Sequence, residues 1–112
     1  LWDKEYLGNP ADFDMNLGWQ RHGSVVYEWC IPLSGPTVYA DHIRMHGEGI
    51  QHFGFAVEDM DKAIAFFVEK GYKISMSGGW GEKGKPGSGR FAYVDLSGIG
   101  GMTVELLWNY QE

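Results

Sequence analysis

The stretch GIQHFGFAVEDMD, residues 49–61, decides the fold that this sequence predicts. Its first part alternates large apolar residues with smaller or polar ones, and this pattern predicts a strand over 51–57. Because successive side chains of a strand point to opposite faces, His52 lies on the face opposite the two phenylalanines. Asp59 then predicts a helix start, since its side chain can accept a hydrogen bond from an otherwise unpaired backbone N–H. The stretch therefore predicts a strand that leads directly into a helix.

The helix that begins at Asp59 is expected to end at Lys70, because Gly71 suits the left-handed position after a helix. Its buried face follows the spacing of an amphipathic helix and comprises Met60, Ala63, Ile64, Phe67 and Val68. A long glycine-rich loop, 78–89, interrupts the strands that follow. These strands are predicted at 72–77, 90–96 and 102–108. Residues 50–110 therefore form a complete βαβββ unit.

Upstream, residues 13–46 predict only part of a second unit of the same kind. The predicted elements, in chain order, are a strand at 13–19, a turn at 21–23, a strand at 24–31 and a helix at 37–46. Residues 1–12 show no hydrophobic period. The chain is therefore expected to be one domain over residues 1–112, with its complete unit at 50–110.

The composition is that of a small acidic protein, and it excludes several classes of function. The 112 residues are 44% hydrophobic and 21% charged, with a net charge of -6, an ordinary balance for one globular domain. No nucleic-acid partner is expected, because phosphate binding needs clustered lysine and arginine. No membrane partner is expected, because no apolar run approaches the roughly 20 residues that span a bilayer. The single cysteine, Cys30, favours a reducing cytoplasm, and its apolar neighbours predict a buried side chain.

Two residues on separate predicted strands form a candidate metal site. Glu105 lies within an apolar strand and shares a face with Leu107, whereas its direct neighbours point the other way. A carboxylate buried there without a partner is costly, so Glu105 needs a cation or a proton. His52 shares a face with Gly54 and Ala56, which leave space for a substrate. One imidazole with one or two carboxylates suits a borderline divalent ion such as Zn, Ni, Co, Fe or Mn.

These residues also have a plain structural interpretation. His52 is then a core histidine with satisfied hydrogen bonds, and Glu105 lies on a solvated sheet face. A separate candidate for metal binding is a pair of histidines, His42 and His46, which lie four residues apart on the predicted helix. Its charged neighbours, and the lack of a glutamate after the first histidine, favour a solvated helix face over a metal site.

The glycine-rich loop carries a partial nucleotide-binding pattern. Residues 79–85 match the start of a phosphate-binding loop, but Pro86 stands where serine or threonine should hold magnesium. We therefore expect no nucleotide site. The loop is either a flap over the metal site, with Lys83, Lys85 and Arg90 available for an anionic substrate, or an exposed linker.

Four segments together resemble the vicinal-oxygen-chelate superfamily, which includes glyoxalase I, bleomycin-resistance proteins and methylmalonyl-CoA epimerase. They are GEGIQHFGFAVEDMD at 47–61, GRFAYVD at 89–95, TVELL at 103–107 and YEWCIPL at 27–33. Members of this family pair two βαβββ modules into a half-open barrel around a metal ion. The resemblance implies an α+β fold of paired βαβββ modules. The first module is expected to be incomplete, because residues 1–12 offer no place for its opening strand and helix.

The resemblance also implies the site, residue by residue. His52 matches the ligand histidine on the first strand of the second module, and Glu105 matches the ligand glutamate on its last strand. Glu28 sits where the first module contributes a ligand or a base. In the family the metal binds two neighbouring substrate oxygens and stabilises an enediolate, so Glu28 or Glu105 is the implied base. The implied function is a metal-dependent isomerase or lyase for a small carbonyl or thioester substrate, similar to methylmalonyl-CoA epimerase or glyoxalase I (lactoylglutathione lyase).

Three further expectations accompany this assignment. The rival function is a metal-free small-molecule binding protein of the bleomycin-resistance type, with an aromatic cleft built from Trp19, Trp29, Trp80, Tyr93 and Trp108. A third interpretation is a folded but inactive fragment of a longer enzyme. An incomplete module leaves an unpaired sheet edge, so a homodimer is expected.

Overall fold

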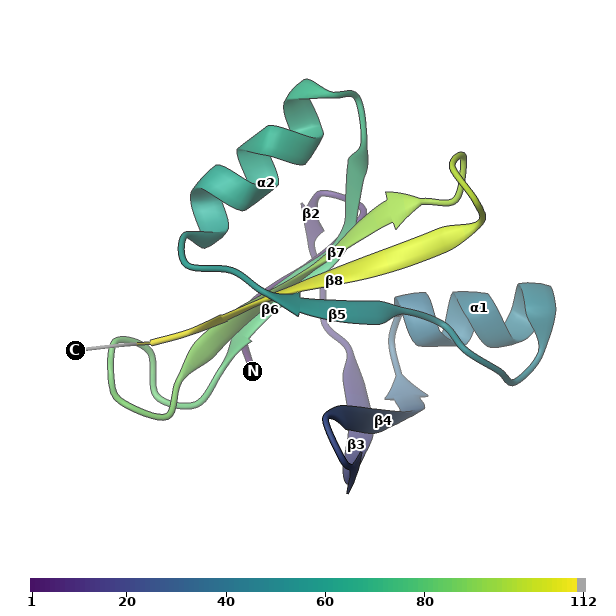
Figure 1. Ribbon diagram of the computed structural model, residues 1–112, viewed down its shortest axis with the longest axis horizontal. Helices are drawn as coiled ribbons and strands as arrows, with labels where there is room; N and C mark the ends of the chain where they lie inside the picture. The colour runs from purple at the N-terminus through teal and green to yellow at the C-terminus, as the bar shows by residue number, and fades with distance from the viewer. Residues whose placement is uncertain (111–112) are drawn as a thin grey trace.

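The computed structural model describes residues 1–110, which form eight strands and two helices (Figure 1). The helices are α1 (Val38–His46) and α2 (Met60–Glu69). The strands are β1 (Trp2–Tyr6), β2 (Asn9–Pro10), β3 (Asp14–His22), β4 (Val25–Ser34), β5 (Phe53–Ala56), β6 (Lys73–Trp80), β7 (Gly89–Leu96) and β8 (Met102–Asn109). The expected α+β fold class is confirmed.

Six strands form one sheet in the order β2-β1-β6-β7-β8-β5. All neighbours are antiparallel except β5, which lies parallel to β8. From β5 the chain passes through α2 and returns along β6, β7 and β8 (Figure 1). This is the βαβββ order that the sequence predicts over 50–110.

Helix α2 covers one face of the large sheet and has the predicted ends. Asp59 Oδ1 accepts a hydrogen bond from the backbone N–H of Lys62 at 3.0 Å, and Gly71 adopts a φ of 89° after the helix. Val68 was expected on the buried face but is 51% exposed, because it lies about 100° further round the helix than Phe67. The core on this face comprises Met60, Ala92, Val94, Val104 and Leu106.

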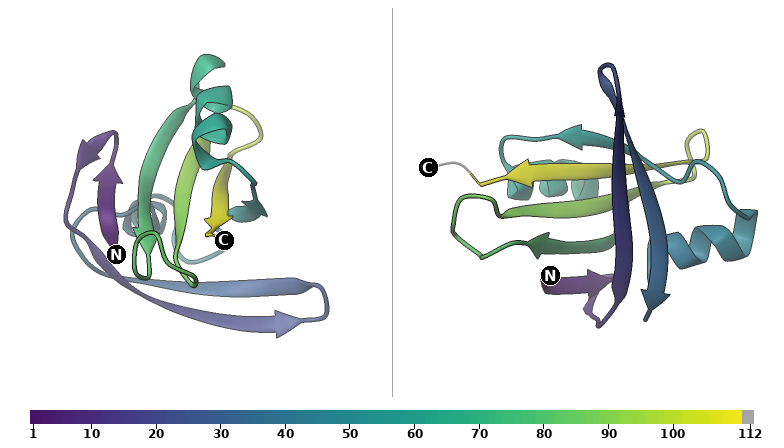
Figure 2. Two further views of the ribbon diagram at one scale, coloured as in Figure 1. Left: turned by 90° about the vertical axis from the view of Figure 1, so that its left-hand side faces the viewer. Right: turned by 90° about the horizontal axis from the view of Figure 1, so that it is seen from below.

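Strands β3 and β4 form a separate antiparallel hairpin that crosses the opposite side of the large sheet (Figure 2). The two sheets are not closed into a barrel. The hairpin and α1 bury a second cluster against the sheet, which comprises Phe13, Val38, Tyr39, Met76, Phe91 and Tyr93. The alternation of side chains along β7 explains why Phe91 and Tyr93 face the hairpin while Ala92 and Val94 face α2.

The start of the chain differs from the sequence prediction. Residues 2–6 show no hydrophobic period, yet they form β1, which pairs with β6. A strand that forms through pairing with its neighbours in the sheet can carry a weak sequence pattern of its own. Strand β6 also continues to Trp80, beyond the predicted end at Ser77, and this shortens the glycine-rich loop to residues 81–88.

Two strand ends near the candidate site also differ from the prediction. Strand β5 covers only Phe53–Ala56, so His52 directly precedes it instead of lying within it. Strand β4 continues through Pro32, which pairs with Met15 where the register shifts. A proline is tolerated at such an irregularity because no regular ladder hydrogen bond is required there. Among residues 1–110, no helix is long and apolar enough to cross a membrane.

Candidate metal centre

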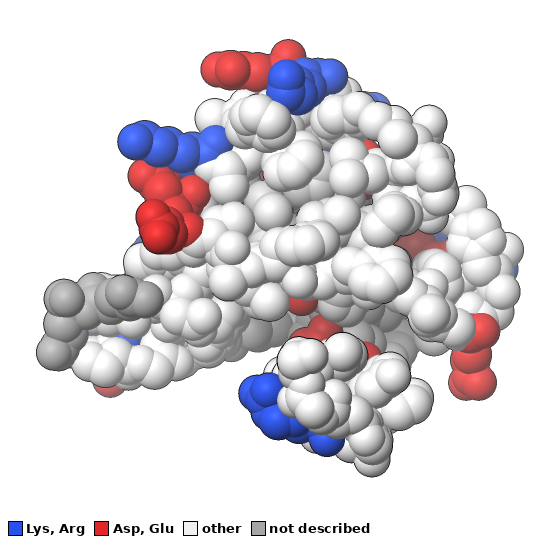
Figure 3. Space-filling model, viewed as in Figure 1, with Lys and Arg blue, Asp and Glu red and all other residues white. Residues whose placement is uncertain are grey.

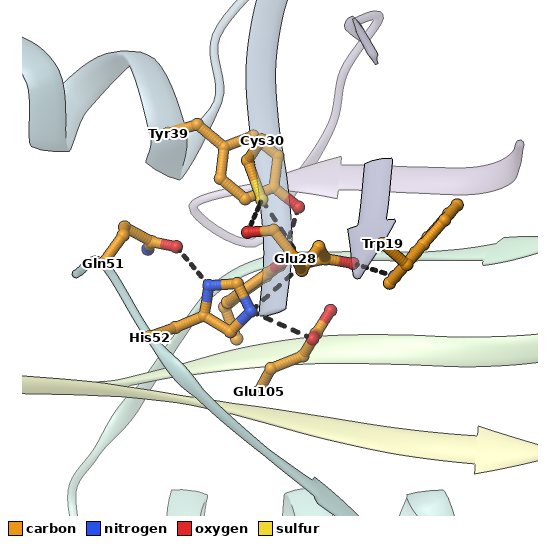
Figure 4. A network of polar contacts seen from close by, with 8 residues as sticks. Trp19, Glu28, Cys30, Tyr39, Gln51, His52 and Glu105 are labelled. Carbon is orange, nitrogen blue, oxygen red and sulfur yellow. Dashed lines mark hydrogen bonds and ion pairs between the residues drawn. The ribbon is translucent and has the colours of Figure 1, made fainter. Parts of the chain in front are cut away.

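His52 lies between two carboxylates that come from different sheets (Figure 4). Its Nε2 is 3.2 Å from Glu28 Oε1 and 3.3 Å from Glu105 Oε1. Glu28 is on β4 of the hairpin, whereas Glu105 is on β8 of the large sheet. The structure thus brings together all three residues that the sequence indicates for the site.

The His52 ring is oriented by contacts on its other side. Gln51 Oε1 lies 2.5 Å from His52 Nδ1, and an amide oxygen there accepts a hydrogen bond from the ring N–H. Tyr93 meets the ring edge-on, with centroids 5.0 Å apart. When Nδ1 carries the proton of a neutral imidazole, the lone pair of Nε2 points toward the carboxylates. This is the tautomer that metal binding through Nε2 requires.

The three side chains are largely removed from solvent: 10% of His52, 18% of Glu28 and 7% of Glu105 is exposed. Figure 3 shows acidic atoms in the notch between the hairpin and the body of the molecule. Burial alone would lower the pKa of His52, but its hydrogen bonds to Glu105 and Glu28 outweigh burial and raise that pKa to about 9. Burial opposes the charge of Glu28 as well, yet hydrogen bonds from His52 and Cys30 lower its pKa.

Two residues that contact Glu28 in the structure, Trp19 and Cys30, are not among the metal-site residues that the sequence predicts. Trp19 is paired with Glu28 across the hairpin, and its Nε1 donates to Glu28 Oε2 at 3.1 Å. The Cys30 thiol donates to Glu28 Oε1 at 3.3 Å. Its position two residues after Glu28 places both side chains on one strand face. That spacing was the available signal for Cys30, whereas the contact with Trp19 depends on the hairpin register.

A pair of buried tyrosines lies beside this cluster. The hydroxyl oxygens of Tyr39, from α1, and Tyr93, from β7, are 2.5 Å apart. Burial is the largest of the effects that raise the pKa of each phenol, so both hydroxyls stay protonated at neutral pH. The pair joins the helix, the sheet and the His52 ring. No local sequence pattern connects Tyr39 with Tyr93, because their contact depends on how α1 packs.

The donor atoms have separations that suit a divalent metal ion. Two ligands bonded at about 2.0–2.3 Å to one tetrahedral ion lie roughly 3.3–3.8 Å apart. The distances from Nε2 to the two carboxylate oxygens are 3.2 and 3.3 Å. Glu28, Cys30 and His52 also offer one donor atom each, and these three atoms lie within 4.8 Å of one another. Imidazole, carboxylate and thiolate donors are the set that borderline ions such as Zn prefer.

The glycine-rich loop lies against β1. Trp2 Nε1 donates to the first carbonyl of the loop at 2.8 Å, and Lys83 Nζ is 2.7 Å from Asp3 Oδ2. Arg90 forms an ion pair with an aspartate of α2 at 3.0 Å. The first two contacts hold the loop against β1. Lys83 and Arg90, two of the three cations expected to meet an anionic substrate, are thus paired with acidic residues.

The aromatic residues of the rival binding site are spread over the molecule. Trp80 packs with the cluster on the hairpin side, Trp108 packs with the cluster under α2, and Tyr93 is fully buried. Trp29 is exposed on the outer face of the hairpin. Trp19 contacts the His52 cluster through Glu28, and Tyr93 meets the His52 ring edge-on from the buried side. A cleft built from all five aromatic residues is therefore not formed.

The unclosed sheets, the βαβββ unit and the His52 cluster between hairpin and sheet define a glyoxalase-like fold. The family model described as the Glyoxalase/Bleomycin resistance protein/Dioxygenase superfamily matches residues 2–93. The chain therefore belongs to that superfamily, as the four segments indicated. The matched range includes Glu28 and His52.

Proposed function

We propose that this chain is a metal-dependent isomerase or lyase, acting in the cytoplasm, that removes a proton from the carbon beside a carbonyl of a small molecule. The observation that carries this proposal is that the carboxylates of Glu28 and Glu105 both lie beside His52 Nε2, at 3.2 and 3.3 Å. These three residues would hold a divalent ion (Zn, Ni, Co, Fe or Mn). Such an ion supplies Lewis-acid stabilisation of the negative charge that develops on two neighbouring oxygens of the enediolate.

Proton transfer is the part of this chemistry that the chain itself performs. Glu28 and Glu105 are both candidate bases, and Glu28 is the better placed because it is more exposed. Trp19 donates to Oε2 of Glu28, and Oε1 lies beside His52 and Cys30, so the carboxylate is held in a fixed orientation within the site. A positioned base contributes typically ~10²–10⁴-fold to the rate.

The substrate class that we favour is a coenzyme A thioester, with epimerisation at the carbon beside the thioester carbonyl. Its support is the overall resemblance to methylmalonyl-CoA epimerase. Isomerisation of a hemithioacetal, as in glyoxalase I, uses the same proton removal and is the second choice. Incubation in deuterium oxide with methylmalonyl-CoA, and separately with the hemithioacetal of methylglyoxal, tests both. Solvent exchange at the carbon beside the carbonyl is expected with the first, and no exchange with either would overturn the proposal.

The alternative is a metal-free binding protein of the bleomycin-resistance type. The observation that favours this alternative is the exposed indole of Trp19 beside the acidic notch. Trp29, Trp80 and Trp108 lie away from the notch, and Tyr93 is fully buried behind His52. Metal analysis of the purified protein separates the two functions. A stoichiometric ion supports the enzyme, whereas ligand binding without any ion supports the binder.

We also propose that the partner of this chain is a second copy of itself. The outer face of β4 is an apolar stripe, with every side chain more than half exposed: Val25, Tyr27, Trp29, Ile31 and Leu33. Within residues 1–110, β5 pairs only with β8, and its other edge is open and carries exposed Phe53 and Phe55. An uncharged stripe and an open strand edge favour self-association about a two-fold axis.

A further inference from the structure

We infer that Cys30 supplies a thiolate ligand to the metal ion proposed above, together with His52 and the carboxylates. This inference rests on the proposed function only in requiring that an ion binds. With Cys30 included, nitrogen, oxygen and sulfur atoms would all bind the ion. A thiolate at this position is absent from the ligand set that the sequence resemblance implies.

The first support is the position of Cys30 on β4. It lies two residues after Glu28, so both side chains point inward, while Trp29 and Ile31 between and beyond them are exposed on the outer face. Cys30 Sγ is 3.3 Å from Glu28 Oε1, the same oxygen that lies 3.2 Å from His52 Nε2. The sulfur and the imidazole therefore contact the same carboxylate oxygen.

The second support is the separation of the donor atoms. One donor atom from each of Glu28, Cys30 and His52 lies within 4.8 Å of the other two. Small side-chain rotations bring such a set to the separations of roughly 3.3–3.8 Å that a shared tetrahedral ion requires. Glu105 lies outside this set of three, but its Oε1 is 3.3 Å from His52 Nε2 and would supply the fourth donor.

A fourth donor also fits the chemistry proposed for this site. A carboxylate that accepts a proton from a substrate would bind a divalent ion less strongly, because it loses its negative charge. With Cys30 among the ligands, three protein donors remain in place while Glu28 or Glu105 takes the proton. Three protein ligands and one open position is the usual arrangement of a catalytic zinc site. A soft thiolate also selects Zn or Co over Mg or Mn.

Cobalt spectroscopy tests the inference directly, because Cys30 is the only cysteine in the chain. The full chain, freed of metal with a chelator, is titrated with Co²⁺ and its absorption spectrum recorded. A thiolate–cobalt bond gives a charge-transfer band in the near ultraviolet, and histidine and carboxylate ligands do not. We expect this band at one equivalent in the wild type and its loss in Cys30→Ser, which keeps the visible bands of bound cobalt.

A competition titration with a zinc-binding dye gives a second readout. Loss of a supporting neighbour typically weakens metal binding about 10–100-fold, so Cys30→Ser should weaken Zn²⁺ binding by more than about 100-fold. Circular dichroism of the same variant confirms that it folds. Visible cobalt bands without a charge-transfer band in the wild type would overturn the thiolate ligand and leave the proposed function intact. No cobalt binding by the wild type would overturn both.

Discussion

His52 and Glu105 face each other because β5, which directly follows His52, lies parallel to β8, which carries Glu105. Gly54 is paired with Glu105 in the register of β5 and β8, and His52 lies two residues before Gly54. Nε2 and Oε1 are 3.3 Å apart. A Cβ at position 54 would lie 3.6 Å from that oxygen. The small residue on β5 thus leaves the carboxylate open to whatever binds beside His52.

Removal of the imidazole should remove the metal. We expect His52→Ala to lose a bound divalent ion that the wild type holds at one per chain, because His52 is the donor that lies next to both carboxylates. Plasma emission analysis of both proteins after gel filtration measures this. His42→Ala is the matched control, since His42 lies on α1 beside His46; it should keep the ion. Equal metal content in His52→Ala and the wild type would contradict the site.

The two carboxylates should differ in their effects on proton exchange. Glu28→Gln keeps the shape of the side chain and removes its basicity, so the rate of deuterium uptake into methylmalonyl-CoA should fall by ~10²–10⁴-fold. Metal content should be reduced less than in Glu105→Gln, because the glutamate of β8 is the more buried of the two. Measurement of metal content beside exchange rate separates the two roles. An unchanged exchange rate in Glu28→Gln would show that Glu28 is not the base and would favour Glu105 instead.

The stability of the metal-free protein should depend on pH through His52. Its pKa is about 9 in the folded chain and about 6.5 in the unfolded chain, so the imidazolium stabilises the fold fully below pH 6.5. This contribution is lost as pH rises through 9. Urea titrations at pH 6, 8 and 9.5 should show a decline in the free energy of unfolding that is larger for the wild type than for His52→Gln. A parallel decline in both proteins would show that other groups are responsible.

Self-association should depend on the outer face of β4. Trp29→Glu places a charge in the centre of the apolar stripe, so we expect a dimeric wild type to become monomeric in multi-angle light scattering. The desolvation of a carboxylate in such an interface is costly. Met45→Glu, on the exposed side of α1, is the control and should stay dimeric. A monomeric wild type at high protein concentration would overturn the proposed partner.

The sequence by itself determined the βαβββ order of residues 50–110 and the direction of the side chains in these elements. Asp59 and Gly71 mark the two ends of α2, and the alternation along β8 places Glu105 on the face opposite Val104 and Leu106. These features depend on neighbours in the chain, because capping and strand alternation act within a few residues. For the same reason the resemblance placed His52 and Glu105 correctly on one side of the sheet.

Only the tertiary structure decided how the hairpin meets the sheet. The packing of β3, β4 and α1 across the large sheet brings Glu28 and Cys30 to His52, and it joins Tyr39 to Tyr93. Pairing with β6 likewise turns the pattern-free residues 2–6 into a strand. Such contacts join residues far apart in the chain, so they depend on the register and twist of whole sheets rather than on local periodicity.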